Sequence, residues 1–473
     1  MNTILANVSN SFFVRNILRT DAARVLEEAG ARLVLLAPEE KLDYYRNQFP
    51  QPWIAWEALP PVRAGQGARL WKLVETSSIV TRTALMLQMA DFLRPGTTSA
   101  GIFSRTAIFL FRRLVSLAGR LPGWRRILRR LYGLFRSGEF DPILTRLRPD
   151  LVFCPSMIYM EDYVLARAAR QRGIPVVGMT LSWDNFYSKT LLLIEPERLI
   201  VHTDFIARQA VCLGDYPRER IVVSGVPQYD DHFLKRRVSP RGAFIRGLGG
   251  DPQKKLILYA MSGKAGLDLD LEILRILWTL CRDGKIAQPV EVLVRPYPRY
   301  DFPPQKLGEI RSQYGFIVHA SMAHVGQARD DWEFDEEALG LLSNSLAHAD
   351  VVINMYSTFL IEAAIWDRPL VVPAFDGTLR RSYWNSARRF FDWNHLADIK
   401  GLGGVRLVKG EVQFADALNR SLADPSAMRE GRMRIAAQQC QFSDGKSGER
   451  VGRALAECLS DQSDKPDRSP QLL

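Results

Sequence analysis

Short runs of β-branched and aliphatic residues alternate with amphipathic helical patterns along most of the chain, and this alternation constrains the fold more than any other feature. Near the start, an apolar run at 3–8 precedes a helical pattern at 21–30 and a second apolar run at 33–36. A strand, a helix and a strand in this order predict a parallel sheet with crossover helices. The sequence therefore predicts an α/β fold.

The series of strands and helices is interrupted once, by a stretch rich in charge, glycine and proline at about 235–254. A second series follows, and 473 residues are too many for one hydrophobic core. We predict two Rossmann-like, doubly wound parallel-sheet domains that face each other across a crevice. The predicted parts are 1–235, 236–445, a last crossover helix at 446–460 and a disordered tail at 461–473.

Cysteine and histidine spacing gives no sign of a metal site. The five cysteines are scattered without a C-x-x-C pair, which argues against a disulfide framework and a zinc site and fits a reducing cytosol. Asp268 and Asp270 have the spacing of a metal-binding D-x-D motif, but a cap of the following helix explains them more simply. We predict no metal and no cofactor.

One segment accounts for most of the net positive charge of the chain. No acidic residue lies between Asp91 and Glu139, although the formal net charge of the chain is +11. The interval contains ten arginines: Arg94, Arg105, Arg112, Arg113, Arg120, Arg125, Arg126, Arg129, Arg130 and Arg136. Apolar residues recur there at three-to-four spacing, at 110, 114, 117 and 121 and again at 127, 128, 131 and 134. This pattern predicts an insertion at about 95–138 with basic amphipathic helices, whose residues 102–135 contact an anionic membrane surface. An RNA-binding arm, or helices that pack on the first domain, are the alternatives.

The strongest functional pattern lies at 349–373. A predicted strand runs into Ser357 and Thr358, which open a helix that contains Glu362. The first N–H groups of such a helix bind phosphate, and a carboxylate one turn later accepts hydrogen bonds from ribose hydroxyls. The alternative is a plain helix cap followed by a solvated helical glutamate.

The strings at 349–354, 357–358, 362–364 and 368–371 resemble the donor-nucleotide motif of GT-B glycosyltransferases. The likeness is to bacterial surface-polysaccharide transferases and the CDP-glycerol glycerophosphotransferase group. It implies the GT-B architecture, with Ser262, Gly263, Lys264 and Arg295 near the donor phosphates. Tyr297 stands where relatives often carry histidine. The string at 442–450 resembles the element that precedes the last helix of the family, which crosses back to the first domain.

A second polar string, Trp183, Asp184 and Asn185, directly follows a predicted strand of the first domain. Relatives carry a similar string, and loops at the carboxyl ends of parallel strands line the crevice. We predict that Asp184 is the catalytic base for an acceptor hydroxyl, with Trp183 and Asn185 on the acceptor side. Glu161 is the alternative base, and an Asx-turn that only braces the loop is the structural alternative.

The sequence therefore predicts a glycosyltransferase that moves a sugar from a nucleotide-sugar donor to a membrane-associated or envelope-glycan acceptor. The predicted location is cytoplasmic, peripheral on the inner face of the cytoplasmic membrane, and nucleic acid is not an expected partner. A CDP-glycerol-type polyol-phosphate transferase, a UDP-sugar epimerase of the same fold and a non-catalytic lipid- or nucleic-acid-binding protein remain alternatives.

Overall fold

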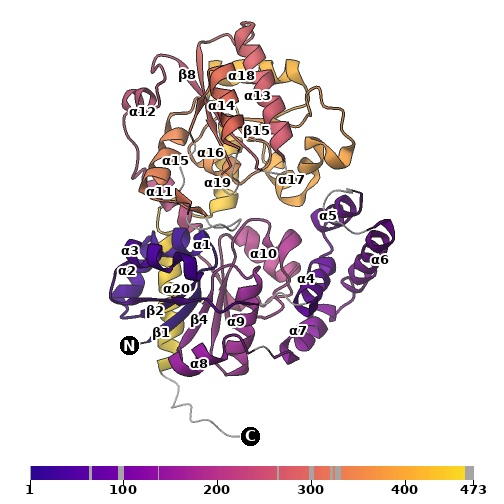
Figure 1. Ribbon diagram of the computed structural model, residues 1–473, viewed down its shortest axis with the longest axis vertical. Helices are drawn as coiled ribbons and strands as arrows, with labels where there is room; N and C mark the ends of the chain where they lie inside the picture. Colours follow the sequence, from indigo (N-terminus) through magenta and orange to yellow (C-terminus); the bar gives the residue numbers. More distant parts are fainter. Residues whose placement is uncertain are drawn as a thin grey trace. The chain divides into compact units, whose positions relative to one another are not determined.

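The computed structural model describes residues 2–62, 66–93, 101–136, 138–263, 266–297, 303–319, 323–324 and 332–463 (Figure 1). The chain divides into two compact units. Unit 1 contains Met1–Asp230 together with Cys440–Leu473, and unit 2 contains Asp231–Gln439. The last residues of the chain therefore belong to the same unit as the first.

Unit 1 is built on a seven-stranded parallel sheet with the order β3-β2-β1-β4-β5-β6-β7. Buried aliphatic side chains cover both faces of this sheet. The strands are β1 (Thr3–Asn7), β2 (Arg32–Ala37), β3 (Ile54–Ala58), β4 (Leu151–Cys154), β5 (Val176–Met179), β6 (Arg198–Val201) and β7 (Ile221–Val223).

Helices of unit 1 pack on its sheet. The helices are α1 (Ser11–Phe13), α2 (Asp21–Glu28), α3 (Leu42–Gln48), α4 (Gln66–Ser78), α5 (Arg82–Leu93), α6 (Ile102–Ala118), α7 (Trp124–Leu134), α8 (Asp141–Leu147), α9 (Met160–Gln171), α10 (Asp204–Cys212) and α20 (Ser447–Ser463). Helices α5 and α6 pack on α4 beside the sheet. The C-terminal helix α20 packs closely on α2 at Gly452. A Cβ added at Gly452 would lie only 2.8 Å from Cβ of Val25. Glycine is needed at this contact.

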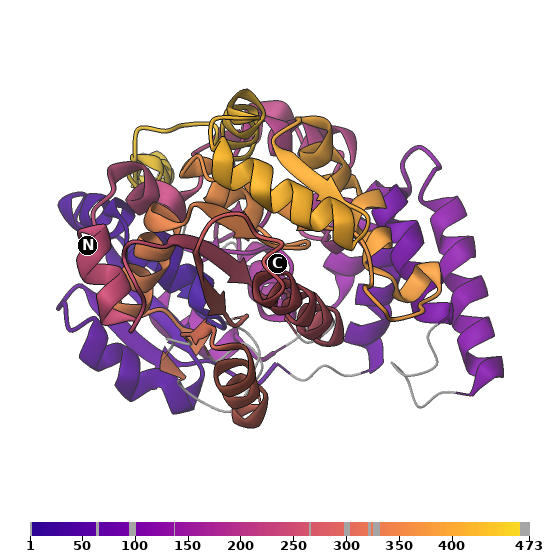
Figure 2. The ribbon, with the colours of Figure 1, turned by 90° about the horizontal axis from the view of Figure 1, so that it is seen from above.

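The basic segment forms two helices, α6 and α7, separated by a turn in which Gly123 has φ +80°. Figures 1 and 2 both show α6 beside α4 and α5 in unit 1. Among the described residues, none of the helices combines the length and the hydropathy that a bilayer crossing requires.

Unit 2 contains a six-stranded parallel sheet with the order β10-β9-β8-β13-β14-β15, and a separate two-stranded antiparallel ribbon of β11 and β12. The strands are β8 (Lys255–Ala260), β9 (Val290–Arg295), β10 (Ile317–Val318), β11 (Ala323–His324), β12 (Trp332–Glu333), β13 (Val351–Ile353), β14 (Leu370–Pro373) and β15 (Val405–Val408). The helices are α11 (Asp230–Leu234), α12 (Arg241–Gly247), α13 (Leu267–Arg282), α14 (Pro304–Tyr314), α15 (Glu336–His348), α16 (Phe359–Ile365), α17 (Asn394–Gly401), α18 (Glu411–Ala423) and α19 (Arg429–Cys440).

The predicted fold class, two parallel-sheet α/β units, is confirmed. In unit 1 the strand order reverses between β1 and β4, and in unit 2 it reverses between β8 and β13. Loops diverge at such switch points, so the carboxyl ends of these strands are where doubly wound sheets bind ligands. The carboxyl ends of β1 and β4 in unit 1, and of β8 and β13 in unit 2, are therefore the candidate ligand-binding positions.

Candidate functional site

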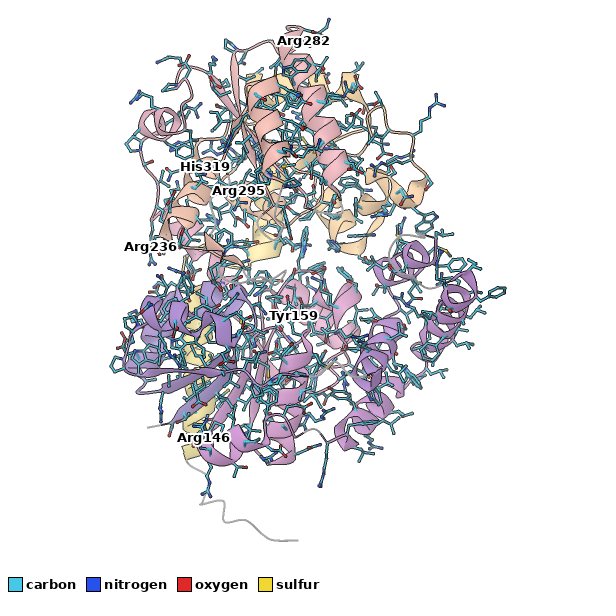
Figure 3. The ribbon with its side chains drawn as sticks, in the orientation of Figure 1. Arg146, Tyr159, Arg236, Arg282, Arg295 and His319 are labelled. Atoms are coloured by element: carbon cyan, nitrogen blue, oxygen red, sulfur yellow. The ribbon has the colours of Figure 1, made fainter. Side chains whose placement is uncertain are left out.

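Predicted donor residues from three separate segments meet at the carboxyl edge of the unit 2 sheet. β9, β8 and β13 are neighbours in this sheet. Arg295 is the last residue of β9, Ser262 and Gly263 follow β8, and Ser357 follows β13. Figure 3 labels Arg295 at the end of its strand. Lys264 lies outside the described residues.

Gly263 is a position where a side chain does not fit. Its φ is +88°, and an added Cβ would lie 2.7 Å from Cδ1 of Tyr297. The Tyr297 ring therefore covers the backbone of the turn after β8, and only glycine allows this approach.

The turn after β8 is held by Asp270, which is fully buried. The backbone N–H of Ser262 donates to Asp270 Oδ2 at 2.8 Å, and the Tyr259 hydroxyl donates to Oδ1 at 3.0 Å. The N-cap of α13 is Gly266, so the prediction that Asp268 or Asp270 caps this helix is wrong. Asp268 is exposed and contacts Arg381 at 3.3 Å. The physical reason is that Asp270 lies inside the first turn, where its side chain reaches back to the strand end.

A histidine lies next to Arg295, although it comes from another strand. The register of β10 on β9 pairs Val318 with Val294, so His319 follows beside Arg295. The backbone N–H of His319 donates to the Val294 carbonyl at 3.2 Å, and Figure 3 labels both side chains. Burial lowers the pKa of His319, which favours its neutral form. The guanidinium of Arg295 lies 5.4 Å from the ring centroid of Phe359.

The turn after β13 is organised by Asn354, a buried residue that the sequence analysis did not single out. Its Oδ1 accepts hydrogen bonds from the N–H and the hydroxyl of Ser357, both at 3.0 Å, and its Nδ2 donates to the Ala260 carbonyl at 2.9 Å. Ser357 Oγ in turn accepts from the N–H of Phe359 at 3.2 Å. Thr358 makes no such capping bond. Asn354 thus ties the Ser357 turn to β8.

Glu362 is only 5% exposed, and its carboxylate faces a buried histidine. Glu362 Oε2 lies 3.4 Å from Nε2 of His232, whose ring packs edge-on against Trp366 with the centroids 6.0 Å apart. The alternative of a solvated helical glutamate is therefore wrong. The partner comes from α11, which is 130 residues away in the sequence. A contact of that kind leaves no local pattern in the sequence. The role of Glu362 towards ribose stays a prediction.

In unit 1, Asp184 lies in the loop that follows β5. Its Oδ1 accepts a hydrogen bond from Lys189 Nζ at 2.8 Å, and the side chain of Asp184 is 15% exposed. Trp183 beside it is buried. Asp184 therefore has a fixed cationic neighbour, and its role as a base stays a prediction.

Asn185, predicted on the acceptor side, is almost completely buried. Its Oδ1 accepts from the N–H of Ser182 at 2.9 Å, and its Nδ2 donates to the Ser156 carbonyl at 3.4 Å. Both ends of the Asn185 amide are thus engaged by backbone groups of the two loops. Asn185 joins the loop after β5 to the loop after β4.

The loop after β4 is held by Asp162 of α9, the residue next to the predicted base Glu161. Asp162 accepts hydrogen bonds from Asn7 Nδ2 at 3.0 Å and from the N–H groups of Ser156 and Met157, each at 3.1 Å. Burial raises the pKa of Asp162 to about 6. Glu161 is half-buried in the first turn of α9, whose N-cap residue Tyr159 is labelled in Figure 3. The structure therefore gathers Asp162, Asn185 and Glu161 at the switch point of unit 1.

Among the described residues, no group of three or more histidine, cysteine, aspartate or glutamate side chains is arranged to hold a metal ion. The arrangement that the structure does show is one of anion-binding groups, hydroxyls and carboxylates at two sheet edges. Such groups bind phosphates and hydroxyls of a polar substrate.

No protein-family model matches the chain, and no curated protein matches its sequence. Solved structures match it over nearly their whole length. MnaA from S. aureus, solved with UDP, gives a TM-score of 0.55 at 11% identity and covers 99% of this chain and 100% of its own. A putative UDP-N-acetylglucosamine 2-epimerase from Listeria monocytogenes gives 0.53 at 13% identity, over 100% and 99%. A glycosyltransferase from Rickettsia africae ESF-5 gives 0.50 at 10% identity, over 98% and 99%. The chain has the GT-B fold.

The Asp270 clamp leads to a prediction about pH. Burial raises the pKa of Asp270 to about 8, so the folded chain keeps a proton that the unfolded chain releases at lower pH. The contribution of Asp270 to the free energy of unfolding is therefore complete below the ordinary aspartate pKa. It decreases as the pH rises from there towards the folded-state pKa of about 8. Asp270→Asn keeps an acceptor for the Ser262 amide and does not ionise. Between about pH 5 and pH 9 the melting temperature of the wild type should fall relative to Asp270→Asn by at least ~3 °C, a change of about 1 kcal/mol in a domain of this size.

Thermal unfolding followed by circular dichroism across this pH range measures the difference. Asp268→Asn is the matched control, because Asp268 is exposed in the same helix turn and should leave the pH profile unchanged. Identical profiles for Asp270→Asn and the wild type would show that Asp270 does not carry the titration.

Proposed function

We propose that this chain is a glycosyltransferase that moves a sugar from a nucleotide-sugar donor to an acceptor hydroxyl. The observation that carries the proposal is the meeting of Ser262, Gly263, Arg295 and Ser357 at one edge of the unit 2 sheet, with Glu362 on the adjoining helix. These residues come from three segments and are the ones to which the family resemblance assigns the donor site. Two of the solved structures with this fold, a UDP complex and a glycosyltransferase, support the substrate class.

In the proposed reaction, Arg295, Ser357, Thr358 and the turn from Ser262 to Lys264 hold the donor diphosphate, and Glu362 accepts hydrogen bonds from the ribose. The acceptor oxygen forms a bond with the anomeric carbon as the bond from that carbon to the diphosphate breaks. Positive charge and N–H groups at the diphosphate stabilise the leaving group, so the step needs no metal. Asp184 takes the proton of the acceptor hydroxyl, with Glu161 as the alternative base.

The donor site is tested by Glu362→Gln. The change keeps the shape of the side chain but removes the charge that strengthens its hydrogen bonds, which are worth about 1.5–3 kcal/mol each. UDP affinity measured by calorimetry should fall about tenfold to a hundredfold, and the loss should be much smaller for 2′,3′-dideoxy-UDP. Because Glu362 is buried beside His232, the melting temperature of the variant is measured in parallel. Equal losses for both nucleotides, or no loss, would count against this donor site.

The base is tested by comparing Asp184→Asn with Glu161→Gln. Removal of a general base lowers turnover by on the order of 10²–10⁴ and leaves donor binding nearly unchanged. We expect this result for Asp184→Asn, measured as nucleoside diphosphate release in the presence of acceptor, with Glu161→Gln close to the wild type. The reverse pattern would assign the base to Glu161, and two active variants would remove both candidates.

A UDP-sugar epimerase is the second candidate, because two of the solved structures with this fold carry that activity in their names. An epimerase converts UDP-N-acetylglucosamine without an acceptor, whereas a transferase releases UDP only when an acceptor is present. Incubation with the sugar nucleotide alone therefore separates the two. Appearance of the 2-epimer would favour the epimerase.

We also propose that α6 and α7 bind an anionic membrane surface and bring the enzyme to a lipid-linked or envelope-glycan acceptor at the inner face of the cytoplasmic membrane. One side of these helices carries large apolar side chains that are each more than half exposed. They are Ile102, Phe103, Leu110, Leu114, Leu117, Leu121, Ile127 and Leu134. Exposed apolar surface of this extent is typical of an interaction site.

The opposite side of the two helices is anchored on unit 1 by specific contacts. The buried Ser116 hydroxyl donates to the Ser77 carbonyl at 2.8 Å, and Trp124 Nε1 donates to Ser78 Oγ at 2.9 Å. Arg129 Nε donates to the Leu192 carbonyl at 3.0 Å. The helices are thus already docked through one side, and packing on unit 1 does not account for the exposed leucines.

Charge supplies the reason for choosing a membrane as the partner. Arg112 pairs with Asp91 at 2.9 Å and Arg129 with Glu195 at 2.6 Å. Among the described residues, no acidic side chain pairs with four exposed arginines of the segment, Arg120, Arg126, Arg130 and Arg136. Exposed leucines bordered by unpaired arginines match a bilayer with anionic headgroups, where each arginine contributes about 1 kcal/mol.

The membrane surface is tested by sedimentation with phosphatidylglycerol vesicles and, for comparison, phosphatidylcholine vesicles. The protein should sediment with the anionic vesicles only. Reversal of Arg120, Arg126, Arg130 and Arg136 to glutamate should lower binding at least about a hundredfold, because each arginine contributes about 1 kcal/mol. The matched control reverses four exposed arginines of unit 2 and should keep most of the binding: Arg246, Arg282, Arg420 and Arg434. Equal binding to both lipids, or binding to single-stranded RNA in place of vesicles, would overturn the membrane assignment.

A further inference from the structure

A basic hollow of about 500 Å³ lies in unit 2, at the carboxyl ends of β14 and β15. Arg380, Arg381, Arg388 and Lys409 contribute four cations to its lining. Lys409 directly follows β15, and the three arginines come from the segment that follows β14. The hollow therefore opens at the same edge of the sheet as the Ser357 turn, but over the other strands.

The charges of this hollow are largely uncompensated within the described chain. Arg381 Nη2 lies 3.3 Å from Oδ2 of the exposed Asp268. Arg380, Arg388 and Lys409 form no ion pair with a described residue. Like charges held together repel one another, so an anion that enters the hollow removes an unfavourable interaction as well as forming new bonds.

The one carboxylate in the described lining, Asp376, accepts a hydrogen bond from the backbone. Asp376 is 8% exposed, and its Oδ1 accepts a hydrogen bond from the N–H of Ala387 at 2.8 Å. The buried Ser386 hydroxyl accepts from the N–H of Arg388 at 3.1 Å and from its Nε at 3.0 Å. These bonds fix the segment that carries the arginines before any ligand arrives, which reduces the entropy lost on binding.

A contact from α13 fixes the other end of the segment. Glu272 Oε1 accepts from the N–H of Thr378 at 2.8 Å and from its hydroxyl at 2.7 Å. Gly377 has φ +62°, and an added Cβ would lie 2.5 Å from Glu272 Cγ. The ring of Tyr356 stacks on Phe390 with the centroids 3.7 Å apart, which joins this segment to the turn that carries Ser357.

We propose that this hollow is a binding site for a phosphoryl group, a phosphate or diphosphate that reaches the guanidinium groups of Arg380 and Arg388 and the ammonium of Lys409. Guanidinium groups bind phosphate oxygens in pairs, and ammonium adds a point charge. The phosphoryl group belongs either to the donor nucleotide or to a second, phosphorylated ligand such as an acceptor. The site itself does not depend on the glycosyl-transfer proposal.

The test uses inorganic pyrophosphate as the probe and the full chain. Arg380→Gln/Arg388→Gln removes two exposed guanidinium groups, and calorimetry should show that pyrophosphate binding weakens at least about tenfold. The matched control, Arg282→Gln/Arg420→Gln, removes the same charge from exposed positions elsewhere in unit 2 and should change the affinity less than about twofold. Lys409→Gln is a second variant that should weaken binding on its own.

Saturating UDP distinguishes the two sources. If pyrophosphate no longer binds and Arg380→Gln/Arg388→Gln also weakens UDP, the hollow holds the donor diphosphate. If pyrophosphate still binds with unchanged affinity, the hollow serves a second ligand. Absence of pyrophosphate binding, or equal weakening by the control variant, would overturn the site. The Glu362→Gln experiment measures only the contact with the ribose. Failure of the donor-site proposal can therefore be distinguished from failure of the phosphoryl-site proposal.

Discussion

A buried carboxylate, Glu75 of α4, joins this helix to the segment that follows the candidate base Asp184. Glu75 is fully buried and accepts hydrogen bonds from the Tyr163 hydroxyl at 2.6 Å and from the N–H of Leu191 at 2.9 Å. Lys72 donates to Glu75 at 2.9 Å and to the Lys189 carbonyl at 2.9 Å. A buried charge is tolerated only when it is paired and fully hydrogen-bonded, so loss of any partner weakens the whole clamp. Glu75 and Lys72 therefore fix α4 to the loop after Asp184, and Arg129 of α7 adds a bond to the Leu192 carbonyl.

In both units a buried aspartate stabilises the turn that follows the strand at the switch point. In each, the strand at the switch point ends in a tight turn, and an aspartate from the first turn of the next helix reaches back to hold it. Asp162 binds the N–H of Ser156 after β4, and Asp270 binds the N–H of Ser262 after β8. Both carboxyls have a raised pKa because both are buried. Each aspartate thus fixes the turn at the carboxyl edge of its sheet where the candidate site residues lie.

The sequence predicts the central strands and the turns of the site, because buried parallel strands read as continuous apolar runs. It does not predict the edge strands β3 and β15 or the ribbon strands β11 and β12. It also misses the partners that the fold supplies from a distance. Asn354 is visible only as a polar residue at a strand end. His232 reaches Glu362 from another helix, and the strand register places His319 beside Arg295. Residue spacing along the chain does not predict contacts between residues that are this far apart in the sequence.

The exposed leucines and the unpaired arginines of the α6 and α7 segment together indicate one kind of partner, a surface that is both apolar and anionic. Exposed leucine side chains forgo about 25 cal/mol for each Å² that burial would remove from water, and the exposed arginines without an acidic partner among the described residues favour an anionic partner. A bilayer accepts both, because the leucines enter the acyl boundary while the arginines stay at the headgroups. Since α4 packs against α6 and holds residues 189–191 through Glu75, a membrane bound at α6 and α7 stands at a fixed place relative to the Asp184 loop of unit 1. The proposed membrane surface and the candidate base Asp184 are therefore linked through buried contacts within unit 1.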